Sequence, residues 1–209
     1  MMSEEWPTPA FGTADWTLNA TETVAHGFFR LDRLHLSHAG HQGVSVGPMT
    51  RELFVREPAA VVALLDPQAR ACVFVEQFRI GVAASDRGES PWLMEWVAGI
   101  CDTDETPEQT AIREVYEETG LTPIGPLRPV ATYYPSPGGS NELIHLYFTT
   151  VDTRQGPRFR GQADEHEDLR VHVVSVDACF QALAQGRINN AATLIGLQWL
   201  QMHRHEYGL

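Results

Sequence analysis

The sequence has few cysteines, no long apolar run and little positive charge, and each shortage excludes a class of protein. Its cysteines, Cys72, Cys101 and Cys179, are odd in number and widely spaced, which fits neither a disulfide framework nor a zinc or redox motif. No apolar stretch approaches the roughly 20 residues of a membrane span. The acidic start, MMSEEWPTPAF, does not resemble a secretory signal. We therefore expect a soluble cytoplasmic protein with reduced thiols and no membrane partner.

Basic residues are fewer than acidic residues in this sequence. The 15 lysines and arginines stand against 27 aspartates and glutamates, which gives a formal net charge of -12. Proteins that bind nucleic acid usually present basic surface to replace counterions, so we expect no nucleic-acid partner. An anionic small-molecule substrate would need local help from arginines or metal ions.

The chain is long enough for one full-sized domain with an appendage. Residues 1–57 contain expected strands at 27–37 and 44–56 and no expected helix, so we assign them to an antiparallel appendage. Residues 58–209 form the main domain, in which strands are expected at 59–65, 71–80, 92–98, 128–134, 142–150 and 169–175, and helices at 107–119, 177–185 and 190–204. The expected fold class is α+β, or mixed α/β, with helices covering a mainly mixed sheet.

The helix expected at 107–119 has complete start and stop signals. Thr106 can act as its N-cap, Pro107 occupies the first helical position and Gln109 completes a capping box. Gly120 can adopt the left-handed conformation that ends many helices. These signals fix both ends of the helix.

Glu114, Glu117 and Glu118 crowd the last turns of this helix. Like charges at such spacing repel each other, and the helix dipole disfavours negative charge at this end. Arg113 can hold a carboxylate in a fixed pose by a bidentate contact. An ordinary solvated face is the plain alternative. A divalent cation would offset both the repulsion between the glutamates and their unfavourable interaction with the helix dipole. A set of oxygen ligands favours Mg²⁺ or Mn²⁺ over zinc.

A wider window carries a family resemblance. Residues 99–121 read GICDTDETPEQTAIREVYEETGL, which fits the pattern G-x5-E-x7-R-E-U-x-E-E-x-G-U at every constrained position, where U is a bulky aliphatic residue. The residues that fill these positions are Gly99, Glu105, Arg113, Glu114, Val115, Glu117, Glu118, Gly120 and Leu121. This stretch resembles the Nudix box. Gly99 lets the backbone turn so that the Ala98 carbonyl can face a metal, and Glu105 can brace the loop against Arg113.

Further stretches resemble the bacterial ADP-ribose pyrophosphatases of this superfamily. They are GFFRLD at 27–32, RELFVR at 51–56, EQFRI at 76–80, PWLMEWVAGI at 91–100, PSPGGSNE at 135–142, ADEHEDLRVHVV at 163–174 and INNAATLIGLQWLQ at 188–201. Pro137 matches a proline that marks this branch. The resemblance implies an α/β/α sandwich and a homodimer in which residues 1–57 reach across to the partner. It also implies hydrolysis of ADP-ribose to AMP and ribose 5-phosphate by a metal-activated water.

The resemblance also implies roles for individual residues. Glu114, Glu118 and the Ala98 carbonyl would bind the metal, with Glu117 in or beside the metal shell and Arg113 among the catalytic residues. In the loop ADEHED, Glu165 matches the general base and Glu167 an additional metal ligand. The alternative for that loop is a plain solvated segment.

Substrate contacts are expected from residues with charged, planar or backbone donor groups. The predicted set is Phe28, Phe29, Arg51, Glu52, Arg56, Arg79, Ile100, Ser136, Pro137, Gly138 and Glu142. By resemblance the arginines contact diphosphate or adenine and one phenylalanine stacks on the adenine ring. The remaining alternatives are sheet-edge arginines paired to local acids, core phenylalanines, and a hairpin turn without a ligand.

Two rival functions stay open from the sequence. Bulky residues around the strand that leads into the box, Met94, Trp96 and Ile100, depart from the resembling pattern and put sugar-nucleotide specificity in question. A hydrolase of another nucleoside diphosphate sugar, such as GDP-mannose, would use the same metals with a different base pocket. A non-catalytic ADP-ribose sensor would usually lack box carboxylates, whereas Glu114, Glu117 and Glu118 are all present.

Overall fold

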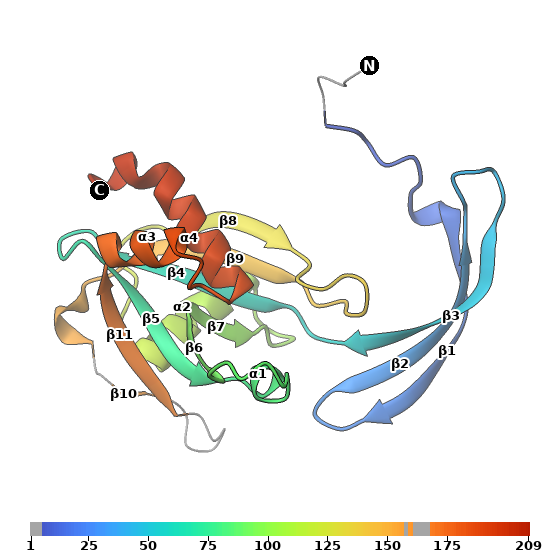
Figure 1. The fold of residues 1–209 in the computed structure, drawn as a ribbon, viewed down its shortest axis with the longest axis horizontal. Coiled ribbons are helices and arrows are strands. Elements are labelled where there is room, and N and C mark those ends of the chain that lie inside the picture. The colour runs from blue at the N-terminus through green and yellow to red at the C-terminus, as the bar shows by residue number, and fades with distance from the viewer. Residues whose placement is uncertain (1–5, 157–158, 161–167) are drawn as a thin grey trace. The chain divides into compact units, whose positions relative to one another are not determined.

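The computed structural model describes residues 6–156, 159–160 and 168–209 (Figure 1). These residues form two compact units. The N-terminal unit comprises the described residues through Arg56 together with Ser136–Glu142, and the main unit comprises Glu57–Pro135 and Leu143–Leu209. The segment Ser136–Glu142 lies outside the range 1–57 that the sequence pattern assigns to the appendage.

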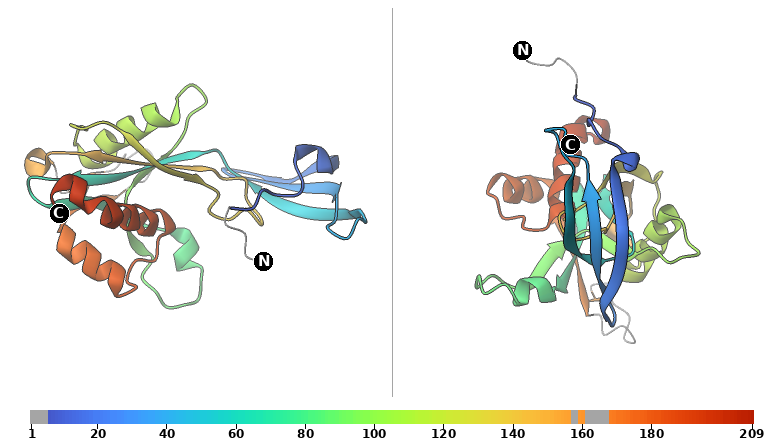
Figure 2. Two further views of the ribbon diagram at one scale, coloured as in Figure 1. Left: turned by 90° about the horizontal axis from the view of Figure 1, so that it is seen from above. Right: turned by 90° about the vertical axis from the view of Figure 1, so that its right-hand side faces the viewer.

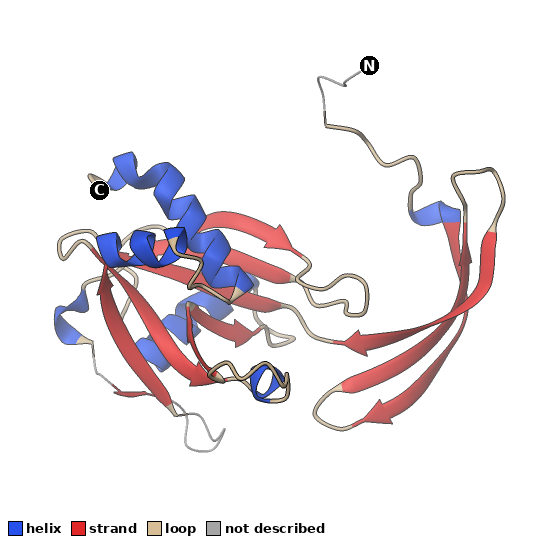
Figure 3. Cartoon of the chain, viewed as in Figure 1, coloured by secondary structure: helices blue, strands red, loops and turns tan. Residues whose placement is uncertain are grey.

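The N-terminal unit is an antiparallel sheet with the strand order β1-β2-β3 (Figure 3). Its strands are β1 (Trp16–His26), β2 (Arg30–His38) and β3 (Val46–Val55), and a 3-10 turn at Thr13–Asp15 precedes them. The strands expected at 27–37 and 44–56 are confirmed as β2 and β3. Strand β1 was not expected, although Trp16, Leu18 and Ala20 alternate with polar residues in its first half. All of its residues are exposed.

The loop that carries Pro137 is hydrogen-bonded to the end of β3. The backbone N–H of Phe54 donates to the Gly139 carbonyl at 2.8 Å. The Asn141 Oδ1 accepts from the backbone N–H of Arg56, also at 2.8 Å. Backbone groups at the end of β3 are thereby satisfied by a segment from the middle of the chain.

The main unit contains a mixed sheet with the strand order β10-β11-β5-β4-β9-β8. Its strands are β4 (Ala59–Asp66), β5 (Ala71–Phe78), β6 (Trp92–Glu95), β7 (Val97–Ile100), β8 (Arg128–Tyr133), β9 (Ile144–Thr150), β10 (Phe159–Arg160) and β11 (Leu169–Ser175). Strands β4 and β9 run parallel, and the other pairs are antiparallel.

Strands β4 and β5 pair only near their connecting turn and then separate. Strand β7 pairs with the start of β4, and β6 pairs with the end of β5. The single strand expected at 92–98 is therefore wrong: the chain bends at Trp96, which is fully buried. The local sequence does not reveal this bend, because the bend depends on the separation of β4 from β5.

Helices cover both faces of this sheet. They are α1 (Ile80–Ala83), α2 (Pro107–Thr119), α3 (Val176–Ala184) and α4 (Ala191–His203), followed by a 3-10 turn at Arg204–Tyr207. Figure 2 (left) shows α2 on one side of the sheet and α3 and α4 on the other. No helix within the described ranges has both the length and the apolar character needed to cross a bilayer.

The residues of β4 alternate between the two layers of core. Ala60, Val62 and Leu64 join the cluster that contains residues of α2, and the intervening residues join the cluster that contains residues of α3 and α4. A strand buried on both faces reads as a continuous apolar run, as this one does. The expected mixed α/β class and the α/β/α layering are confirmed.

Candidate active site

Helix α2 begins and ends where the sequence predicts. The Thr106 Oγ1 accepts from the Gln109 N–H at 3.3 Å, and the Gln109 Oε1 accepts from the Thr106 N–H at 2.8 Å. Gly120 ends the helix in the left-handed conformation, with a φ of 74°. Ala111 and Val115 are fully buried against the sheet. Both ends and the packed face of α2 are therefore fixed, and so is the direction in which its glutamates project.

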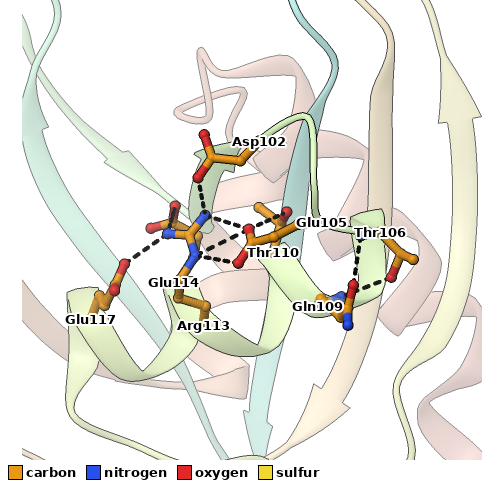
Figure 4. Close-up of polar contacts among 8 residues, drawn as sticks. All are labelled: Asp102, Glu105, Thr106, Gln109, Thr110, Arg113, Glu114 and Glu117. Carbon is orange, nitrogen blue, oxygen red and sulfur yellow. Dashed lines mark hydrogen bonds and ion pairs between the residues drawn. The ribbon is translucent and has the colours of Figure 1, made fainter.

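Arg113 is the centre of an ion-pair network (Figure 4). Its Nη2 donates to the Glu105 Oε2 at 2.9 Å, and its Nη1 donates to the Glu114 Oε1 at 2.7 Å and the Glu117 Oε2 at 2.8 Å. The hydrogen bonds to Glu105 are the largest of the influences that raise the pKa of Arg113. The same contact lowers the pKa of the Glu105 carboxyl. The expected bracing of the loop by Glu105 is present, and one guanidinium offsets the repulsion between the helix carboxylates.

Two carboxylates of α2 converge on one short stretch of β7. Glu118 is 4% exposed, and its Oε2 accepts from the Ala98 N–H at 3.3 Å. Glu114 lies against Gly99 so closely that a Cβ built on the glycine would stand 1.9 Å from the Glu114 Oε1. A side chain at position 99 would therefore require Glu114 to move. The packing of α2 against β7 thus brings Ala98, Glu114 and Glu118 together.

This arrangement fits a hard divalent cation in the type of its donors. The acidic groups gathered here offer only oxygen, as Mg²⁺ and Mn²⁺ prefer. Within the described residues no group of His, Cys, Asp or Glu side chains is already arranged to hold a metal ion. The Arg113 contacts to Glu114 and Glu117 account for part of this, since they direct these carboxylates toward the guanidinium. Glu165 and Glu167 lie outside the described residues.

Two predicted substrate residues lie in the main unit. Arg79 follows β5, and its Nε donates to the Glu95 Oε2 at 2.7 Å. Ile100 ends β7 and is 40% exposed. Arg79 is therefore paired to a local acid, while its side chain remains 42% exposed.

The other predicted substrate residues lie in the N-terminal unit, where a subset forms one cluster. The guanidinium of Arg56 lies 4.4 Å from the ring centre of Phe29, and its Nη2 lies 3.0 Å from the Glu142 Oε1. Phe28 packs edge-on against Phe29 and is itself 85% exposed. Phe54 contacts Phe29 from another side.

The remaining predicted residues of this unit have more local partners. Arg51 donates from its Nη1 to the neighbouring Thr50 carbonyl at 2.9 Å. Glu52 lies 3.5 Å from Arg33 in an ion pair across β2 and β3. Ser136 begins a turn in which its carbonyl accepts from the Gly139 and Ser140 N–H groups, and Pro137 and Gly138 lie within that turn. Their substrate contacts stay predictions.

Sequence reasoning missed a buried acid beside Arg79. Glu95 is 4% exposed, and its second oxygen accepts from the Asn190 Nδ2 at 2.6 Å. A charged residue inside the apolar run WLMEWVAGI is a signal that could have identified it, because glutamate is rarely buried without a partner. Its partner Asn190 is far away in sequence and could not have been inferred.

Comparisons with known proteins show the family of this chain. The family model described as NUDIX domain matches residues 55–194. A protein of Escherichia coli (strain K12) named ADP-ribose pyrophosphatase is 42% identical over 92% of this chain and 91% of its own length. A protein of the same name from Haemophilus influenzae is 38% identical over 92% of this chain and 89% of its own.

More distant matches include another named activity and a solved structure. A protein of Shigella flexneri named GDP-mannose pyrophosphatase is 32% identical over 73% of this chain and 78% of its own. A crystal structure described as an ADP compounds hydrolase superposes with a TM-score of 0.66 and 17% identity, covering 90% of this chain and 96% of that one. At this identity the solved structure supports the fold alone.

Proposed function

The chain belongs to the Nudix hydrolase family, and on that premise we propose that it hydrolyses the pyrophosphate bond of ADP-ribose to AMP and ribose 5-phosphate. The observation that carries the proposal is the convergence of Glu114 and Glu118 of α2 on Ala98 and Gly99 of β7. The relatives named ADP-ribose pyrophosphatase, which match over nearly the whole chain, support this choice of substrate.

We propose that Mg²⁺ or Mn²⁺ is the cofactor. Glu114, Glu118 and the Ala98 carbonyl would hold it, with Glu117 beside them. When bound, such a cation neutralises diphosphate charge and lowers the pKa of a coordinated water. The guanidinium of Arg113 holds the carboxylates of Glu114 and Glu117 in fixed orientations.

The general base is assigned to the loop ADEHED. We propose that Glu165 accepts a proton from the attacking water and that Glu167 adds a metal ligand. Both assignments rest on the resemblance of residues 163–174, since the loop lies outside the described residues. A carboxylate near a divalent cation stays ionised at neutral pH, as a base must.

For the adenine ring we propose Phe28 as the stacking residue. Its neighbour Phe29 already contacts Arg56, Phe28 and Phe54, whereas Phe28 is 85% exposed. An exposed aromatic ring costs free energy in water unless a ligand or partner covers it. Arg79 is proposed as a diphosphate contact, because a guanidinium suits the paired oxygens of a phosphate.

A homodimer is proposed for the assembly, with the N-terminal unit as the contact surface. Several large apolar side chains of this unit are exposed. They include Trp16 at 48%, Leu18 at 45%, Val24 at 41% and Phe54 at 38%. A small sheet with an apolar face is rarely stable without a covering layer, and a second copy would supply one.

We also propose a cytoplasmic location. Cys72, Cys101 and Cys179 are free thiols, and Cys72 and Cys179 are buried. Free thiols are typical of a reducing compartment.

A product assay with three substrates tests the function. Purified protein is incubated with ADP-ribose, ADP-glucose and GDP-mannose, with and without Mg²⁺, and the products are separated by chromatography. We expect AMP from ADP-ribose only when metal is present. Failure to release AMP under these conditions would reject the proposal. Preferential release of GMP would favour the second candidate, a GDP-mannose hydrolase, which the 32% identical relative supports. Binding of ADP-ribose without cleavage would indicate a sensor.

A further inference from the structure

Arg79 is held at one edge of its guanidinium by a buried carboxylate. Its Nε donates to the Glu95 Oε2 at 2.7 Å, and the two side chains are 42% and 5% exposed. Among the described residues, no hydrogen bond is made by its Nη1 or Nη2. A guanidinium anchored through Nε has a fixed plane and presents two parallel donors on its outer side.

Glu95 is in turn held by the N-cap residue of α4. The Asn190 Nδ2 donates to the Glu95 Oε1 at 2.6 Å, and the Asn190 Oδ1 accepts from the Thr193 N–H at 2.9 Å. The backbone contact fixes the orientation of the amide, because only the oxygen can accept from an N–H group. The position of Glu95 therefore depends on where α4 begins.

These two contacts require a carboxylate at position 95. Both oxygens of Glu95 face donors, the Arg79 Nε on one side and the Asn190 Nδ2 on the other. A glutamine there would turn an NH₂ group toward one of these donors, and Asn190 cannot flip to accept it without losing the Thr193 contact. The amide would thus be unfavourable although its shape is the same.

We propose that Glu95, oriented by Asn190, is a positioning residue that aligns the guanidinium of Arg79 with the diphosphate of the substrate. The inference rests on the proposed function, in which Arg79 contacts the diphosphate. A bidentate contact between a guanidinium and two phosphate oxygens depends on the angle of its plane, so loss of the anchor weakens the contact while the charge of Arg79 remains.

Two variants break the chain of contacts at different points. Glu95→Gln replaces one of the two acceptor oxygens, which face Arg79 and Asn190, with a donor. Asn190→Ser keeps an oxygen that can cap α4 but removes the Nδ2 donor. We expect each variant to raise KM about tenfold, as for loss of a charged hydrogen bond, with a smaller change in kcat. Steady-state kinetics with ADP-ribose and with GDP-mannose measure the effect on two substrates that share the diphosphate.

A matched control separates positioning from a general loss of stability. Ser175 caps α3 through its Oγ, which accepts from the Ala178 N–H at 3.3 Å, and it belongs to no part of the proposed site. Ser175→Ala removes a helix cap in the same unit. We expect it to lower the melting temperature and to leave KM unchanged. An equal rise of KM in Ser175→Ala would attribute the effect to stability and overturn the inference.

A double-mutant cycle decides whether Glu95 acts through Arg79. In an Arg79→Ala background, Glu95→Gln should raise KM no further, because there is no guanidinium left to align. Independent, multiplicative effects of the two substitutions would overturn the inference and leave the role of Arg79 intact. If Arg79→Ala itself left KM unchanged for both substrates, the proposed diphosphate contact would fail, and the positioning role with it.

Discussion

Gly99 of β7 lies directly against Glu114 of α2, with no room for a methyl group between them. A Cβ at this position would stand 1.9 Å from the Glu114 Oε1 and 2.1 Å from its Cδ. The glycine is required by this close approach rather than by a turn. It therefore sets where one of the proposed metal ligands can rest.

Gly99→Ala should displace Glu114 and lower activity by at least tenfold. The clash is with a side chain that can move, so the cost in stability is expected at about 1–3 kcal/mol, typical of overpacking. The matched control is Gly81→Ala, where a Cβ would meet nothing within 4 Å. AMP release and thermal unfolding measure both effects. Wild-type turnover in Gly99→Ala would show that Glu114 can be displaced without consequence.

Glu118→Gln should lower kcat by orders of magnitude while the fold persists. The substitution keeps the shape and an oxygen that can accept from the Ala98 N–H, but it removes the charge that a cation needs. It also relieves repulsion with neighbouring glutamates, so the melting temperature should not fall. Glu89→Gln, at an exposed ion pair with Arg87, serves as the control and should be silent. Full activity of Glu118→Gln would contradict the metal assignment.

Phe28→Ala and Phe29→Ala should separate binding from stability. Phe28 is 85% exposed, so its truncation should raise KM for ADP-ribose and leave the melting temperature nearly unchanged. Phe29 packs against Phe54 and Arg56, and its truncation should cost about 1–2 kcal/mol of unfolding free energy. Kinetics and denaturant unfolding of both variants provide the test. A larger rise of KM in Phe29→Ala than in Phe28→Ala, at equal stability, would reverse the assignment.

Asp66 should make the stability of the main unit sensitive to acid. Burial favours its neutral form, but hydrogen bonds from Ala69, Thr153 and Gln68 outweigh burial and lower the pKa of this carboxyl. A folded-state pKa below the unfolded value stabilises the protein above the unfolded pKa of about 3.9, and this contribution is lost as the pH falls through the folded pKa.

The measurement is the free energy of unfolding of wild type and Asp66→Asn at several pH values. At neutral pH the variant should be less stable, because its NH₂ group would face the Thr153 donors that now bind Oδ2. The difference should shrink below about pH 4, where Asp66 is protonated first in the unfolded chain and then, at lower pH, in the folded protein. A difference that stays constant down to the lowest pH would exclude this role for Asp66.

The parts of the fold that the sequence predicts well are those set by local signals. Helix α2 has the expected bounds because Thr106, Gln109 and Gly120 act within a few residues of its ends. Strand β1 was missed because the alternation of apolar and polar residues covers only its first half, from Trp16 to Thr21. The bend at Trp96 was missed because it depends on β4 and β5 separating, which no local sequence encodes.

The candidate site also has a part that local sequence signals predict and a part that depends on long-range contacts. The box residues follow one another on a helix of known phase, so their gathering around Arg113 was predictable. The contact of Arg79 with Glu95 and that of Glu95 with Asn190 join positions 16 and 95 residues apart. Such contacts arise only when the whole sheet and α4 are assembled. A buried acid in an apolar strand indicated that a partner exists, without identifying it.

The hydrogen bonds between Ser136–Glu142 and the end of β3 determine whether the N-terminal sheet can be removed from the chain or transferred to another protein. A truncated form beginning at residue 57 would retain this hairpin tip but remove the Phe54 and Arg56 backbone groups that hydrogen-bond to it. The N-terminal sheet is thus not a detachable module. A graft that transplants it onto another enzyme of this kind would have to bring the matching tip as well, as two fragments from distant points of the gene.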